Sequence, residues 1–318
     1  MDIKKTVRIS ASLLIIILIG YFYSAEVRKN WASLQDFKLN LNVFFLLVSL
    51  FFYLLSYLLD TYTWQVCIHR HLGRRELDFF QSIAVVNGSG LLKYLPGRIW
   101  TYTAQLLWLN KFNISKSLIL YVNVLCIAGA MIVSLYLGVI YSAAYTDIMN
   151  TATITLAFAA LIALNIIYIS WNSLFMNKAL AMASRILKRE IHPIKGSKAL
   201  LLFIQFMYAC SWSLMGLGGY FLARGIGLDI AFTSIIALLA SMSLSWLVGY
   251  LVILSPGGLG IREGIMLLML NGVVNTQTAL IFPILSRLMS LMAEALLGLV
   301  ALSFGMKYNV FSIKKEPQ

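Results

Sequence analysis

Long apolar stretches separated by short polar segments dominate the hydropathy pattern of this sequence. Six of these stretches are long enough to cross the apolar core of a lipid bilayer as helices. They cover residues 9–24, 41–64, 117–142, 151–172, 199–223 and 277–304. The pattern predicts an all-α polytopic membrane protein with about six full transmembrane helices.

Two further apolar segments are interrupted near their centres by proline and glycine. Residues 79–110 are broken at KYLPGRIW (93–100), and residues 231–272 are broken at SPGGLG (255–260). Proline ends or kinks helices and glycine weakens them, so each segment is expected to form helix, break, helix. We expect both to be re-entrant hairpins, although residues 231–254 alone are long enough to cross a bilayer.

The distribution of Lys and Arg predicts how the spans are oriented. With the N-terminus inside and each broken segment returning to its own side, fifteen basic residues face the cytoplasm and four face outward. Such a bias is typical of cytoplasmic loops. The inner set is Lys4, Lys5, Arg8, Arg70, Arg74, Arg75, Lys178, Arg185, Lys188, Arg189, Lys195, Lys198, Lys307, Lys314 and Lys315; the outer set is Arg28, Lys29, Lys38 and Arg224. Both termini are therefore expected in the cytoplasm.

The order of elements predicts an internal repeat. Span, span, hairpin, span occurs twice, with the second hairpin entering from the opposite side. The halves cover about 1–148 and 149–310 of a single integral membrane domain, 1–318. Residues 177–198, within the second half, are basic, and they are expected to form a cytoplasmic loop with an amphipathic helix on the inner leaflet. Inverted repeats with broken helices are typical of secondary transporters.

Composition narrows the class further. The chain is 60% hydrophobic and 12% charged, against about 25% charged residues in a typical soluble domain. The net charge of +13 would suggest nucleic acid in a soluble protein, but basic cytoplasmic loops account for it here. Cys67, Cys126 and Cys210 show no paired spacing, so neither a disulfide nor a metal site is expected. No Walker motif is present, and we expect no cofactor.

The second break has the features of an anion site. A helix that starts near Ile261 would point its free amide groups toward the break, and such a helix end attracts phosphate. Arg262 adds a full charge on a planar group that can hold phosphate bidentately. If the two breaks meet, Lys93 and Arg98 would join Arg262 in a cationic cluster within the membrane.

Two interpretations of these charges stay open. Glu263 and Glu294 could simply neutralise Arg98, Arg262 and Arg287 in structural ion pairs. Alternatively, Arg262 binds the phosphate of a cargo, and Glu263 or Glu294 balances its charge when the site is empty. Arg287 and Glu294 are seven residues apart, so both should project from one face of the last span.

Two nearby sets of residues are expected to have other roles. Asp60 is expected to be a helix-end residue at the membrane interface. The aromatic residues near the first break are expected to pack or to lie at the interface, rather than to bind a ligand. These are Tyr94, Trp100, Tyr102 and Trp108.

YLPGRIW (94–100) and SPGGLGIREG (255–264) together resemble the lysylphosphatidylglycerol synthase transmembrane-region family, also described as flippase-like domain proteins. The resemblance covers about residues 5–310. It implies a membrane fold that moves lipid-linked cargo between leaflets: aminoacylated phosphatidylglycerol in some members, glycolipid or polyprenyl-linked glycans in others. The positions to which it applies are Pro96, Gly97, Arg98, Pro256, Gly257, Gly258, Gly260, Arg262 and Glu263. The sequence lacks the synthases' soluble aminoacyl-transferring domain, so the resemblance supports transport rather than synthesis.

The sequence thus favours a lipid flippase in the cell membrane, with a phosphate-bearing membrane lipid as its partner. A membrane-embedded lipid-modifying enzyme is less well supported, because paired Asp motifs are absent and no His lies near the breaks. A non-transporting accessory subunit that works with lipid- or glycan-synthesising enzymes is a third possibility. Nucleic acid is not expected as a partner.

Overall fold

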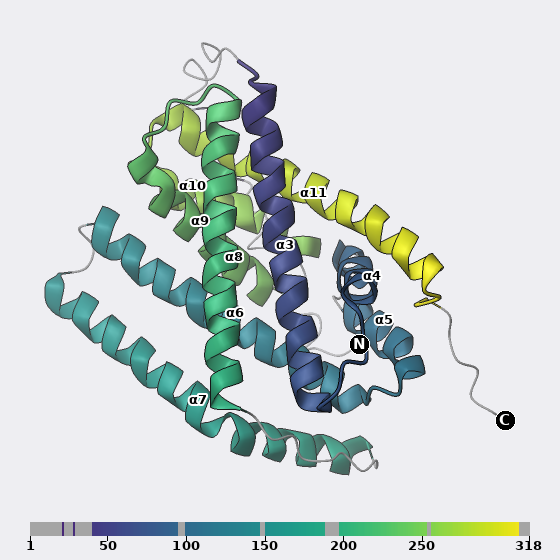
Figure 1. The fold of residues 1–318 in the computed structure, drawn as a ribbon. Coiled ribbons are helices and arrows are strands. Elements are labelled where there is room, and N and C mark those ends of the chain that lie inside the picture. The colour runs from purple at the N-terminus through teal and green to yellow at the C-terminus, as the bar shows by residue number, and fades with distance from the viewer. Residues whose placement is uncertain are drawn as a thin grey trace.

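The computed structural model describes residues 40–94, 99–146, 150–187, 197–252 and 256–311, together with Tyr21 and Arg28. All named elements in these ranges are helices (Figure 1), so the all-α prediction is confirmed. The α-helices are α3 (Val43–Leu72), α4 (Phe79–Gly90), α5 (Ile99–Leu109), α6 (Lys116–Tyr145), α7 (Thr151–Leu187), α8 (Lys198–Gly225), α9 (Ile235–Leu251), α10 (Ile261–Leu270) and α11 (Thr276–Lys307). Four short 3-10 helices join them: η1 (Leu91–Tyr94), η2 (Asn110–Phe112), η3 (Phe232–Ser234) and η4 (Pro256–Gly258).

Polar residues fix where several helices begin. Asn42, Asp78, Ser115 and Asn275 precede α3, α4, α6 and α11. Each accepts a hydrogen bond from a backbone N–H in the first turn, which satisfies one of the free donors of a helix start. Gln81 also accepts from the Asp78 backbone N–H at 2.9 Å, which completes a capping box.

Six helical segments are long and apolar enough to cross a membrane. Five correspond to predicted spans: Val43–Leu72, Lys116–Tyr145, Thr151–Ser170, Lys198–Gly225 and Thr276–Lys307. The predicted span 9–24, apart from Tyr21, lies outside the described residues. The sixth segment, Phe232–Leu251, belongs to the second broken segment. The protein is therefore a multi-pass membrane protein.

Each broken segment folds back so that its start and end lie at the same end of the molecule. Leu77, just before α4, packs in one cluster with Leu109 at the end of α5. Asn275, which follows α10, donates a 2.9 Å hydrogen bond to the carbonyl of Asp229, which precedes α9. This geometry matches the expectation that each broken segment returns to the side from which it starts. That the segments are re-entrant in a membrane, and that the two halves form an inverted repeat, remain predictions.

The two broken segments are not equal in length. Helices α4, α5 and α10 have 12, 11 and 10 residues, while α9 has 17. About 20 residues are needed to cross a bilayer, so α4, α5 and α10 are each too short to do so. The second segment therefore combines a nearly full-length arm with a short one.

Helix α7 continues beyond the predicted span 151–172. It runs unbroken to Leu187, so the first part of the basic region 177–198 extends this helix instead of forming a separate one. Residues 188–196 lie outside the described part of the chain. In Figure 1, α7 lies along the outer edge of the bundle.

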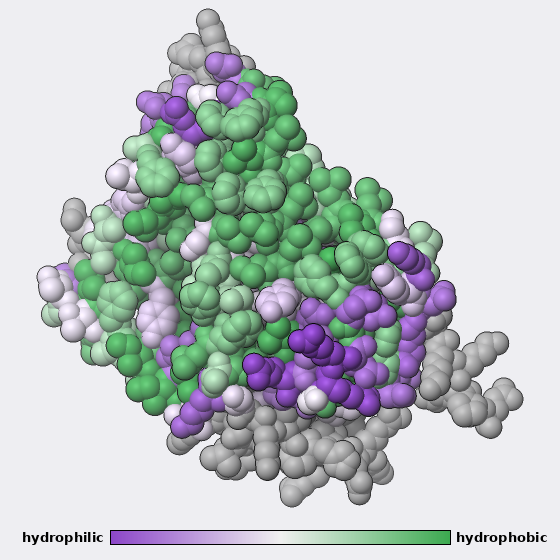
Figure 2. Space-filling view, viewed as in Figure 1, coloured by the Kyte–Doolittle hydropathy of each residue, from purple (hydrophilic) through white to green (hydrophobic). Residues whose placement is uncertain are grey.

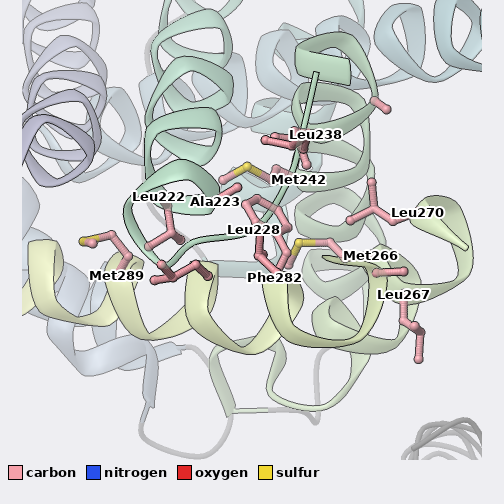
Figure 3. Close-up of a cluster of buried hydrophobic side chains, with 14 of the residues drawn as sticks. Leu222, Ala223, Leu228, Leu238, Met242, Met266, Leu267, Leu270, Phe282 and Met289 are labelled. Atoms are coloured by element: carbon pink, nitrogen blue, oxygen red, sulfur yellow. The ribbon is translucent and has the colours of Figure 1, made fainter. Parts of the chain in front are cut away.

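Two buried clusters hold the helices together. One joins α8, α9, α10 and α11 and includes Leu222, Leu238 and Phe282 (Figure 3). The other joins α3 to α6 and includes Trp64, Leu109 and Ile119. Helices α3 and α8 run side by side in Figure 1. A Cβ on Gly218 of α8 would lie 2.7 Å from the Tyr53 ring of α3, so a small residue permits this close approach.

The outer surface suits a lipid environment. Figure 2 shows hydrophobic residues across the middle of this face and hydrophilic residues gathered toward its ends. Large apolar side chains such as Phe44, Leu156 and Leu299 are more than 60% exposed. In a bilayer these side chains would face lipid tails, and no water would be ordered around them.

Candidate functional site

The two broken segments meet inside the bundle, through Tyr94 of η1 and Gly257 of η4. A Cβ on Gly257 would lie 2.5 Å from Cε1 of the Tyr94 ring, so only glycine fits here. Of the residues expected at the first break, Lys93 is described, whereas Pro96, Gly97 and Arg98 lie outside the described residues. The meeting of the breaks is therefore seen just before Pro96, at Tyr94, and not at Pro96 itself.

The glycines of the second break adopt a backbone that other residues rarely adopt. Gly257, Gly258 and Gly260 have φ of 60, 78 and 81°, in the left-handed region where a Cβ is strained. Pro256 lies in η4 with Gly257 and Gly258, and Gly260 precedes the first turn of α10. This conformation ends one helix and starts the next within a few residues, as the sequence predicted.

Glu294 is the centre of a hydrogen-bonded network. Its Oε1 accepts from Lys93 Nζ at 2.6 Å and from the Tyr57 hydroxyl at 3.0 Å. Its Oε2 accepts from the Tyr94 hydroxyl at 2.6 Å. One carboxylate on α11 thus binds side chains from α3 and η1. The predicted cationic cluster forms in part, with Lys93 already neutralised by Glu294.

Arg287 is the second paired cation. Its side chain is 5% exposed, and its Nε lies 3.7 Å from Glu263 Oε1, an ion pair too long to be a hydrogen bond. Its Nη2 donates to the Gly257 carbonyl at 2.8 Å, and its guanidinium lies 5.9 Å from the centre of the Tyr94 ring. Arg287 therefore holds η4 against η1 and α11.

Arg262 differs from the other two cations. Among the described residues it has no ion pair or hydrogen bond, and its buried Nε has no partner. Its side chain lies between two glycines: a Cβ would lie 2.8 Å from Cγ if placed on Gly249, and 2.8 Å from Nε if placed on Gly258. The expected counter-ions Glu263 and Glu294 instead bind Arg287 and Lys93. Neither carboxylate forms an ion pair with Arg262 among the described residues, because each has a nearer partner. Whether either one balances the charge of Arg262 in the empty site stays a prediction.

A cavity of about 150 Å³ lies beside these residues. Arg262, Arg287 and Lys93 line it together with Glu294 and Asp60. Its other lining residues are Ser56, Tyr57, Ala130, Tyr208, Ser211, Trp212, Met215, Met242, Ser245, Trp246, Met266, Ser286 and Ser290. Met242 and Met266 also belong to the apolar cluster in Figure 3, so the cavity adjoins the core. The wall is charged on one part and apolar or hydroxylic on the rest. Arg287 and Glu294 share it, as their spacing on one helix face predicted.

The position predicted for Asp60 is wrong, and Tyr57 was not predicted as part of the site. Asp60 lines the cavity and is not at a helix end, because α3 continues twelve residues beyond it to Leu72. Tyr94 packs against Gly257, as expected of a packing aromatic residue, and it also donates a hydrogen bond to Glu294 and contacts Arg287. Tyr57 sits one turn before Asp60, and this spacing on one apolar helix could have indicated a shared face.

The glycine cradle of Arg262 gives a prediction with an internal control. Gly258→Ala places a Cβ 2.8 Å from Arg262 Nε, whereas Gly260→Ala has nothing within 4 Å. Both positions have positive φ, so both variants should lose about 1–2 kcal/mol of stability. Only Gly258→Ala should also push against the Arg262 side chain, so it should be the less stable of the two. Melting temperatures of the two purified variants check this, and equal melting temperatures would contradict it.

A family model described as the lysylphosphatidylglycerol synthase TM region matches residues 7–298 of the 318-residue chain. The match includes every residue that lines the cavity. A search of curated proteins finds no match.

Proposed function

Since the chain belongs to the lysylphosphatidylglycerol synthase transmembrane-region family, we propose that it moves a phosphate-bearing lipid between the two membrane leaflets. The observation that carries this proposal is Arg262, a cation that lines an internal cavity and has no partner among the described residues. An ionisable group at membrane depth is costly and points to function. A phosphate would supply the counter-charge that Arg262 lacks.

The arrangement around Arg262 supports binding of an anion over a structural ion pair. A guanidinium offers a rigid set of donors that matches two phosphate oxygens. Lys93 and Arg287 form ion pairs with Glu294 and Glu263. The charges of these two pairs also contribute to the electrostatic potential that an incoming phosphate meets. In this proposal Glu294 and Glu263 fix the site's geometry, and Arg262 binds the cargo.

The size of the cavity bears on which part of a lipid enters it. A volume of about 150 Å³ corresponds to about five water molecules. A phosphate with a small head group fits that volume, whereas acyl chains do not. The head group would therefore pass through the protein while the chains stay in the bilayer. Aminoacyl-phospholipids and phosphate-linked polyprenyl glycans carry the phosphate that this mechanism needs, whereas a glycolipid would need a phosphorylated head group.

We further propose that the basic end of the molecule faces the cytoplasm of a cell membrane. This end carries Arg70, Arg74, Arg75, Lys111, Lys116, Lys198 and Lys307. Lys111 of η2 donates to the carbonyl of Tyr308 at 3.3 Å, which ties η2 to the end of α11 there. Among the described residues of the opposite end, Arg224 and Asp229 carry charge. Positive charge is retained on the cytoplasmic side of membranes.

Cysteine labelling tests this orientation. We expect Asp229→Cys to react with a membrane-impermeant maleimide on intact cells, whereas Arg74→Cys and Lys188→Cys should react only after permeabilisation. Cys67 and Cys126 are buried and Cys210 is partly buried, so Cys210→Ser provides the background. Reaction at Arg74→Cys or Lys188→Cys in intact cells would show the opposite orientation.

Translocation by the purified protein tests the function itself. The full chain is reconstituted into liposomes that contain a fluorescent phospholipid, and the fraction accessible to an external quencher is followed over time. We expect faster exchange between leaflets than in protein-free liposomes. Chemical change of the lipid would instead favour the enzyme alternative. If neither exchange nor chemical change is observed, an accessory role with lipid- or glycan-synthesising enzymes would be favoured.

A further inference from the structure

The cavity is lined by a second ionisable group without an ion pair, of opposite type to Arg262. Asp60 of α3 has no ion-pair partner among the described residues, and its buried Oδ1 has no hydrogen-bond partner. Of the other described Lys, Arg and Glu side chains in and around the cavity, Lys93 and Glu294 form one pair, and Arg287 and Glu263 form another. Within the described part of the chain, Arg262 and Asp60 are therefore left without an ion pair.

The surroundings of Asp60 suit a cation. Ser211 lies beside the carboxylate and also exchanges a 2.8 Å hydrogen bond with Ser56. The rings of Trp212 and Trp246, 5.6 Å apart and edge to face, form the neighbouring wall. A carboxylate next to Trp rings is a favourable site for an ammonium group, because charge attraction and cation–π attraction act together.

Asp60 and Arg262 line the same cavity, whose volume is about 150 Å³. Asp60 comes from α3, and Arg262 comes from the first turn of α10. A single small head group that fills this cavity can therefore meet both side chains.

We propose that Arg262 and Asp60 bind the two ends of one zwitterionic head group, so that the cargo is a phospholipid with one phosphate and one protonated amine. This inference rests on the proposed function and narrows its substrate class. A phosphate alone would neutralise Arg262 but leave Asp60 without a partner, and an unpaired buried charge is costly. A head group with both charges satisfies both residues and enters the cavity without net charge.

A comparison of the translocation rates of two lipids tests the proposal. Phosphatidylethanolamine and phosphatidylglycerol, with the same chains and the same chain-linked fluorophore, are reconstituted with the full-length protein. We expect the wild-type protein to move phosphatidylethanolamine faster. Asp60→Asn should lower the ratio of the two rates by about ten-fold or more, the usual loss for a hydrogen bond to a charged group. Asp229→Asn, the same change at an exposed position, should leave the ratio unchanged.

Binding of free head groups gives a readout that does not depend on translocation. Glycerophosphoethanolamine should raise the melting temperature of the wild-type protein more than glycerophosphoglycerol does, and Asp60→Asn should remove that difference. If Asp60→Asn does not fold, Trp246→Leu, which removes one aromatic wall, should lower the same ratio.

Equal preference for both head groups in the wild-type protein, or an equal loss for both in Asp60→Asn, would overturn the proposal. If neither lipid moves, the proposed transport fails while the binding comparison still decides the nature of the head-group site.

Discussion

Arg262→Gln is expected to slow lipid translocation by about 10- to 100-fold, which corresponds to the loss of a hydrogen bond to a charged group. The reason is that Arg262 is the cation of the cavity without a partner among the described residues. Arg262→Lys keeps the charge but loses the planar set of donors, so its rate should lie between those of the wild-type protein and Arg262→Gln. Liposome assays on the purified variants measure all three rates.

The same variants separate a cargo site from a structural ion pair. If Arg262 only neutralised a buried carboxylate, removing it would cost about 3–5 kcal/mol of stability. No such carboxylate contacts it among the described residues, so we expect Arg262→Gln to melt at or above the wild-type temperature. Arg224→Gln, the same change at an exposed helix end, is the matched control. Normal translocation by a stable Arg262→Gln protein would refute the phosphate site.

The second large effect should be on stability, at Glu294. Glu294→Gln leaves Lys93 without its 2.6 Å partner and weakens the acceptor for Tyr57 and Tyr94. An uncompensated buried charge costs about 3–5 kcal/mol, so this variant should express poorly and melt well below the wild-type protein. Thermal melting in detergent measures the loss.

A double variant tells whether the pair itself is responsible. Lys93→Met with Glu294→Gln removes both charges, so it should be more stable than Glu294→Gln alone. Glu76→Gln is the control, because its ion pair with Arg74 at 2.9 Å is exposed and should contribute less than about 1 kcal/mol. A double variant no more stable than the single one would show that the hydrogen bonds from the tyrosines matter more than the charge.

Hydropathy predicted most of the spans because membrane helices are defined by length and apolarity. The boundaries of α6, α8 and α11 differ from the prediction by one to three residues at each end. The prediction for α3 was eight residues short at its end, because polar residues follow residue 64. Two of these polar residues form hydrogen bonds within the fold: Gln65 Nε2 donates to the Leu77 carbonyl at 2.9 Å, and His71 Nδ1 lies 2.8 Å from the Cys67 carbonyl. Because the predicted helix ended too early, Asp60 was expected near a helix end, whereas it lies in the interior of α3.

The candidate site could be predicted only in part. Pro-Gly breaks and nearby charges identified Lys93, Arg262, Glu263 and the glycines, since each residue type has a strong local effect on backbone or charge. Pairing could not be predicted, because it depends on packing. Lys93 and Glu294 are 201 residues apart, and Tyr57 and Glu294 are 237 apart. No periodicity relates such residues, so which carboxylate neutralises which cation emerges only from the fold.

The long separation between Lys93 and Glu294 also constrains how the protein is made. Ribosomes add about 5–20 residues per second, so the 201 residues between the two side chains take about 10–40 s to synthesise. Throughout that time Lys93 exists without its carboxylate. An ammonium group is poorly tolerated at membrane depth without a partner, so η1 should stay near the aqueous interface until α11 has been inserted. The broken segments would then settle against each other last, as a post-insertion step of membrane biogenesis.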